Sequence, residues 1–149
     1  MRLKVIPRNA TLAWSPAHHL PVIATGTVAG AMDASFSNTT DLELFSLALE
    51  NKGVEHQEVS SPAAKVSSNA RFNQLAWGYV GGDRQYGVIA GAMENGELDF
   101  WDPEAILAGK GADECLVLRN TTHAGPVRAV DFNPVQVNLL ASAAGNGEV

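Results

Sequence analysis

The sequence predicts an all-β fold, a β-propeller fragment of about two and a half four-stranded blades. The first observation behind this prediction is an internal repeat. Similar patterns of apolar runs and turns recur within residues 13–45, 75–101 and 130–149. Repeats of this length, rich in short strands, stack so that each unit buries its faces against its neighbours. We interpret the 149 residues as one domain, with blade one at about 10–60, blade two at about 70–119 and an incomplete blade three at about 123–149.

The second observation is that the repeats keep their register. A separation of 51 residues links Ile89 to Leu140, and the same separation links the Asn-Gly pair at 95–96 to the pair at 146–147. Asn-Gly between apolar runs is a strong hairpin signal, and we expect type I′ turns with positive φ at both central residues. A β-sandwich with accidental pseudo-repeats is the alternative. Turns at the same phase of two copies favour the propeller.

The first copy differs from the others by an insertion. The connection between its second and third strands is ten residues longer than in the second copy, with the extra residues around Met32–Ser37. The following connection, 51–68, is polar and contains Pro62 and several Ser residues. Such composition predicts a surface loop, here around a weak strand near 54–59.

The second copy, Val88–Asp102, is predicted as a hairpin whose second strand alternates polar and apolar residues. An Asp-Pro-Glu sequence at 102–104 then indicates a helix start, because Asp caps the helix and Pro fits its first position. Gly109 can end this short helix, and the apolar run 115–118 is predicted as the fourth strand.

Composition narrows the classes of partner. The net charge is −6, with 10 Lys and Arg against 16 Asp and Glu, so a nucleic-acid or anionic-membrane surface is not expected. No apolar run reaches membrane-spanning length, so we expect no direct membrane insertion. The first ten residues alternate charged and apolar side chains, unlike a signal peptide, which favours a cytoplasmic location. On that interpretation the Asn-X-Thr sequons at 9–11, 38–40 and 120–122 are chance matches.

The sequence contains the signature residues of WD repeats in degenerate form. Trp101-Asp102 is the dipeptide itself, and His123 opens a segment that resembles the Gly-His motif. In WD blades, a His, a Ser or Thr, an Asp in the inner turn and the Trp share hydrogen bonds. The third copy offers His123 and Ser142, but has Asn146 where Asp is expected. The second copy has Gly at the Ser position and Asn at the Asp position, so we expect it to depend on packing.

A closer resemblance covers nearly the whole chain in order. The sequence is similar to the opening of the Sec-thirty-one family, the scaffold proteins of the COPII outer coat. The matching segments are Ala13–Pro16, Ala24–Thr27, Leu42–Phe45, Leu75–Gly78 and His123–Asp131. The insertion is specific to that family, and its residues are Asp33, Ala34, Ser35, Phe36 and Ser37.

This resemblance implies a function and a set of partners. It implies a seven-bladed propeller of which this chain is a fragment, with Met1–Ile6 as the outer strand that closes the ring. It also implies a non-enzymatic scaffold in vesicle transport from the endoplasmic reticulum to the Golgi. The implied partners are a Sec-thirteen-like coat protein, other copies of the scaffold and inner-coat proteins, on COPII vesicles and at exit sites.

No group of residues predicts catalysis, a metal site or a cofactor site. The adjacent His18 and His19 diverge in an extended segment, and no Cys or further His lies at zinc spacing. Cys115 is predicted to be inert in an apolar strand. Two further sets are assigned structural roles: Trp14, Trp77 and Trp101 as core residues at corresponding strand positions, and Glu94, Glu97 and Asp99 as solvated carboxylates.

Two alternative functions remain open. One is a WD-repeat adaptor of another pathway, such as a ubiquitin-ligase substrate receptor, and the other is a secreted glycosylated propeller. Whichever function applies, fewer than three full blades leave a blade face and a strand edge uncovered. We therefore expect the isolated chain to unfold with poor cooperativity or to associate.

Overall fold

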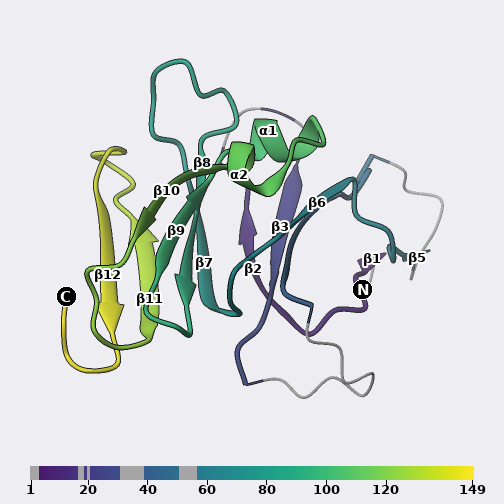
Figure 1. Cartoon of the computed structure of the whole chain (residues 1–149). Helices are drawn as coiled ribbons and strands as arrows, with labels where there is room; N and C mark the ends of the chain where they lie inside the picture. Colours follow the sequence, from purple (N-terminus) through teal and green to yellow (C-terminus); the bar gives the residue numbers. More distant parts are fainter. Residues whose placement is uncertain (1–3, 17–18, 20, 31–38, 51–56) are drawn as a thin grey trace.

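The computed structural model describes residues 4–16, 19, 21–30, 39–50 and 57–149. Most of the regular structure in these residues is β-strand. It forms two four-stranded antiparallel sheets, a two-stranded antiparallel sheet and a two-stranded parallel pair. The first three sheets lie side by side like blades, in the order of the chain (Figure 1). The prediction of two complete blades and part of a third is confirmed.

The first blade has its strands in the order β2, β3, β4, β6. Their bounds are β2 Ala10–Trp14, β3 Val22–Thr27, β4 Asp41–Ser46 and β6 Ala64–Ser67. The weak strand expected near 54–59 corresponds to β5, Gln57–Glu58, which pairs outside this sheet with β1, Lys4–Val5. The fourth strand of the blade therefore comes later than expected. Residues 31–38, which hold the insertion, lie outside the described residues.

The second blade has its strands in the order β7, β8, β9, β10. Their bounds are β7 Phe72–Gly78, β8 Val88–Met93, β9 Leu98–Trp101 and β10 Leu116–Asn120. Two short helices, α1 Pro103–Leu107 and α2 Ala112–Cys115, connect β9 to β10. Both helices contact β6 of the first blade, so this connection also joins the two blades.

The helix start at Asp102 is confirmed. The Asp102 carboxylate accepts hydrogen bonds from the backbone amides of Glu104 and Ala105, and Gly109 follows the helix with a φ of 71°. The assignment of Cys115 to a strand is wrong. Its amide donates to the carbonyl of Gly111, so it completes α2, and β10 begins one residue later.

The third blade contains β11, Val127–Phe132, and β12, Leu140–Ala144. The turns of the second and third hairpins lie where the Asn-Gly pairs predict them, but their type differs from the prediction. Gly96 and Gly147 have φ values of 91° and 93°, whereas Asn95 and Asn146 are not among the residues with positive φ. The Met93 amide bonds to the carbonyl of Glu97, which leaves a three-residue loop. Such a loop is typical of a type I turn followed by a glycine bulge.

The hydrophobic core is divided by the second blade into two layers. The larger layer fills the space between blades one and two and includes Leu42, Phe72 and Trp101. The smaller layer lies between blades two and three and includes Ala92 and Val130. The innermost strands β2, β7 and β11 contact one another in sequence. No helix of the described residues is long and apolar enough to cross a membrane.

A glycine permits the close approach of the first two blades. A Cβ atom built on Gly26 of β3 would lie 2.5 Å from the Phe72 ring, which is fully buried. Real Cβ atoms do not approach so closely, so any larger residue must displace this ring. Gly26 thus fixes how deeply Phe72 of the second blade enters the first.

Candidate functional site

The WD-type residues of the third blade form a connected polar group. His123 lies 2.9 Å through Nε2 from Ser142 Oγ and 3.3 Å through Nδ1 from Glu148 Oε2. Ser142 belongs to β12, whereas His123 belongs to the segment before β11, so these contacts fasten that segment to the blade. This is the His-to-Ser part of the WD network.

The carboxylate of this group comes from a residue that the sequence analysis missed. Glu148 Oε2 also accepts a 2.9 Å hydrogen bond from the Ala124 backbone amide. Asn146, expected at the carboxylate position, instead accepts a 3.4 Å hydrogen bond from the Glu148 amide. The pKa of the Glu148 carboxyl is lowered, mainly by the Ala124 amide and then by Asn146 and His123. An acid two residues after the turn Asn was the available signal.

The second blade is built around packing of its Trp. Trp101 is almost fully buried, and its ring meets the Phe72 ring edge-on at 5.5 Å between centroids. A Cβ atom on Gly91 would lie 2.7 Å from the Phe72 ring and 2.8 Å from the Trp101 ring. The aromatic rings therefore occupy the space that a Ser side chain would need at this position. This agrees with the expectation that the blade depends on packing.

Asp102 of the Trp-Asp pair has a second contact besides capping α1. Its Oδ2 accepts a 2.9 Å hydrogen bond from Arg84 Nη1, in the loop between β7 and β8. Trp77 Nε1 holds the same loop by donating to the carbonyl of Tyr86 at 2.6 Å. The Tyr86 ring in turn lies 4.6 Å from the His19 ring of the first blade. His18 lies outside the described residues.

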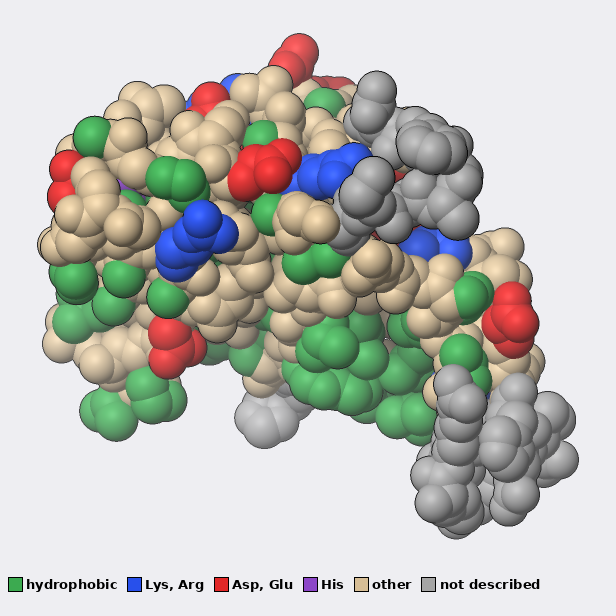
Figure 2. Space-filling view, turned by 90° about the horizontal axis from the view of Figure 1, so that it is seen from below, with side chains coloured by type: hydrophobic (Ala, Val, Ile, Leu, Met, Phe, Trp, Pro, Cys, Tyr) green, Lys and Arg blue, Asp and Glu red, His purple; other side chains and the backbone are tan. Residues whose placement is uncertain are grey.

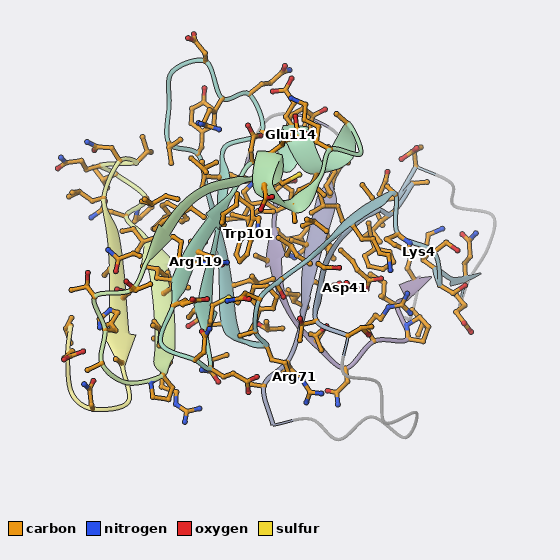
Figure 3. All side chains as sticks on the ribbon, viewed as in Figure 1. Lys4, Asp41, Arg71, Trp101, Glu114 and Arg119 are labelled. Carbon is orange, nitrogen blue, oxygen red and sulfur yellow. The ribbon has the colours of Figure 1, made fainter. Side chains whose placement is uncertain are left out.

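Each complete blade buries a carboxylate paired with an arginine. Asp99 has no exposed surface and accepts from Arg119 Nε and Nη2 at 2.8 and 2.7 Å. Figure 3 places Arg119 and Trp101 on the sheet of the second blade. In the first blade, Arg8 Nε and Nη2 bond to the Glu43 carboxylate at 2.8 and 3.2 Å. The pKa of each arginine is raised, first by its hydrogen bond to that carboxylate.

These ion pairs correct the prediction of solvated carboxylates for Asp99. Glu43 and Asp99 occupy the same register position, because Glu43 pairs with Thr25 and Asp99 pairs with Gly91 on the neighbouring strands. A buried charge is tolerated when it is ion-paired and hydrogen-bonded. The sequence carries both partners, but their separations of 20 and 35 residues follow no motif.

The three tryptophans do not share one environment. Trp77 and Trp101 are buried as predicted, but the side chain of Trp14 is 50% exposed, so its assignment to the core is wrong. Trp14 lies on the face of the first blade that points away from the second, and no described sheet covers it. Residues 33–37 of the insertion lie outside the described part of the chain. Among the described residues no group of three His, Cys, Asp or Glu is arranged to hold a metal ion.

Comparison with known proteins places these features in a family context. No family model matches the chain. It is 49% identical over 150 residues to protein transport protein SEC31 of Mycosarcoma maydis, across 97% of this chain and 10% of that protein. It is 50% identical to protein transport protein SEC31 of Ajellomyces capsulatus, across 100% of this chain and 11% of that protein. The chain thus spans about a tenth of the length of the curated relatives it matches.

Solved structures agree with this similarity. A chain of the structure described as COPII on membranes, outer coat vertex, superposes with a TM-score of 0.72 at 34% identity. The match covers 95% of this chain and 32% of that chain. The WD40 domain of Toxoplasma gondii coronin superposes with a TM-score of 0.59 at 19% identity, over 97% of this chain and 32% of that chain, which shows the fold alone. The fold is that of a WD-repeat propeller in part.

Proposed function

We propose that this chain, which resembles the N-terminal WD-repeat propeller of the SEC31 transport proteins along its whole length, is a structural part of the COPII outer coat. The observation that carries the proposal is the similarity at about half identity, which covers the whole chain with a comparable match in each listed SEC31 protein. The match of the same residues to an outer-coat vertex structure supports it independently.

The internal contacts suit a scaffold. Two core layers, two buried ion pairs and a helical connection hold the blades in fixed relation. A rigid body of this kind offers surfaces for assembly, because little conformational freedom is lost when partners bind it. The chain would contribute shape to the coat rather than chemistry.

The proposed partners are those of an outer-coat scaffold. They are a Sec-thirteen-like coat protein, further copies of the scaffold and inner-coat proteins. Contact with the membrane would be peripheral, on COPII vesicles and at exit sites of the endoplasmic reticulum. Within a closed propeller, Met1–Ile6 would form the outer strand of the last blade.

A segment exchange tests this proposal. The matching N-terminal part of SEC31 from Mycosarcoma maydis is replaced by residues 1–149 of this chain, and the fusion carries a fluorescent tag. We expect the tagged protein to gather at exit sites and to co-purify with the Sec-thirteen-like partner of that organism. The control exchange uses the matching part of the coronin WD40 domain, which has the fold without the sequence similarity.

Two outcomes would contradict the proposal. One is a folded exchange protein that stays diffuse and lacks the coat partner. The other is an equal result for the coronin control, since the fold alone would then explain recruitment. A WD-repeat adaptor of another pathway would give the first outcome, and mass spectrometry of the co-purified proteins would identify its partners.

A further inference from the structure

The near face of each blade, which meets the preceding blade, carries large apolar residues at a fixed register. In the second blade these are Leu75 and Trp77 of β7, which are 3% and 8% exposed. The matching residues of the first blade are Leu12 and Trp14, because Trp14 pairs with Ile23 as Trp77 pairs with Ile89. Leu12 and Trp14 are 56% and 50% exposed. The near face of the first blade is therefore built like a blade interface but lacks a blade.

A second observation indicates that this near face is incomplete. Thr25 of β3 is directly opposite Leu12 in the sheet, so both side chains lie on the same face. The Thr25 hydroxyl is buried and has no hydrogen-bond partner in the part of the chain that the structure describes. Its counterpart in the third blade, Ser142, contacts His123. Figure 2 shows hydrophobic side chains gathered along the lower edge of that view, beyond the polar centre of the molecule.

The far face of each blade carries small residues that receive these large side chains. In the first two blades the small residues are Ala24 and Gly26, then Ala90 and Ala92, and all of them are buried. The third blade repeats the pattern with Ala141 and Ala143 of β12. There Ala141 is exposed and Ala143 is half-buried. The small residues of this last far face line an open groove of about 250 Å³.

We propose that two copies of this chain associate head to tail, the near face of the first blade of one copy packing on the far face of the third blade of the other. The contact would continue the two blade interfaces already present within the chain, with Leu12 and Trp14 set against Ala141 and Ala143. Blades follow one another by a repeated rotation, so such a contact extends the series in the direction of a ring. Heterologous contacts of this kind close when the rotation does.

The charged group on the far face is compatible with this contact. Asp131 is paired with Ala141 in the sheet and is exposed. It also borders the larger groove of about 460 Å³ along the inner strands β2, β7 and β11, where its carboxylate stays in water. The inference does not depend on the proposed function, since it rests on the blade faces alone.

Sedimentation equilibrium of the purified chain between about 1 and 100 μM tests the proposal. A near-face variant, Leu12→Glu with Trp14→Glu, and a far-face variant, Ala141→Glu with Ala143→Glu, are each compared with the parent. A matched control, Val135→Glu, changes a residue that is 91% exposed in the loop between β11 and β12. The parent and the control are expected to rise in mass from 15.7 kDa to twice that value or more.

Mixing the two variants separates this contact from unspecific association. Each variant alone is expected to remain monomeric with the parent's far-ultraviolet circular dichroism, because each retains only one intact face. Their equimolar mixture is expected to form a dimer, since the intact far face of one meets the intact near face of the other. A parent that stays monomeric throughout, variants that associate alone, or a mixture of folded variants that stays monomeric would overturn the proposal.

Discussion

Asp99 shows how much a single residue depends on its partner. The carboxylate has no access to water, and Arg119 binds it through two nitrogen atoms. Removing one partner of a buried pair leaves a charge without compensation, which is more damaging than removing both. The Arg119 side chain is itself one-third exposed, so water can offset part of the loss.

We expect Arg119→Gln to lower the free energy of unfolding by about 2–3 kcal/mol, discounted from the range for fully buried pairs because Arg119 is partly solvated. The double variant Arg119→Leu with Asp99→Leu should recover most of this loss. Urea denaturation followed by circular dichroism measures both. Lys65→Gln is the control, because Lys65 pairs with Asp41 in an exposed position and should cost about 1 kcal/mol or less. Equal losses for Arg119→Gln and Lys65→Gln would contradict the account.

Glu148 predicts a response to pH at the end of the third blade. Its pKa is lowered from the ordinary value of 4.5, chiefly by the Ala124 amide. A carboxyl whose folded pKa is depressed contributes stability above its unfolded pKa, and this contribution is lost as the pH falls through the folded pKa. The contacts of Glu148 with His123 and Ala124 should therefore weaken only below the ordinary range of a glutamate.

Nuclear magnetic resonance titration of the Glu148 side-chain carboxyl carbon measures this shift. We expect a midpoint below that of Glu104, an exposed carboxylate in the same chain. The Ala124 amide signal should move with the same midpoint, because it donates to Glu148. A Glu148 midpoint at or above that of Glu104 would show that the contact does not form.

At the scale of elements, the connection between β9 and β10 tests how Asp102 stabilises α1. Asp102→Ala removes both the helix cap and the ion pair with Arg84, and we expect a loss of about 1–2 kcal/mol in unfolding free energy. Asp102→Asn retains a capping oxygen and should lose less than half as much. Thermal and urea unfolding of the three proteins give the comparison. Equal losses in the two variants would assign the effect to the ion pair instead of the cap.

Elements signalled by local chemistry could be predicted from the sequence. The Asp-Pro-Glu start of α1 and the positions of the Asn-Gly turns are local signals, and both are found. The turn type was missed because Asn tolerates positive φ without requiring it, whereas Gly96 alone adopts it. The burial of Asp99 was missed because its partner lies on another strand, and sequence spacing does not reveal such pairing.

At the scale of the molecule, the repeat predicted three blades and the structure contains two complete and one partial. The repeat could not show which faces stay uncovered, because burial depends on neighbours rather than on a residue's own pattern. Trp14 illustrates this: it matches Trp77 in register, yet it is half exposed. The WD-type contact of His123 was predictable with Ser142, but its carboxylate was assigned to the wrong residue because Glu148 lies beyond the turn.

The close packing of the first two blades gives a prediction at this scale. Gly26→Ala should lower the unfolding free energy by about 1–3 kcal/mol, because the new methyl group meets the Phe72 ring. Pairing it with Phe72→Leu should yield a smaller combined loss than the sum of the single changes. Gly30→Ala is a control with a positive φ but no atom within reach of a Cβ. Additive losses in the double variant would contradict direct contact between Gly26 and Phe72.

The proposed role in the coat is tested most directly by the rate of transport in living cells. In Mycosarcoma maydis depleted of its own SEC31, the exchange protein carrying residues 1–149 of this chain is the only source of that scaffold. Pulse–chase labelling then measures how fast a secreted glycoprotein acquires Golgi modifications. We predict a rate close to that of the parent SEC31. A rate as low as that of depleted cells, with the exchange protein folded and present at normal amount, would contradict the account.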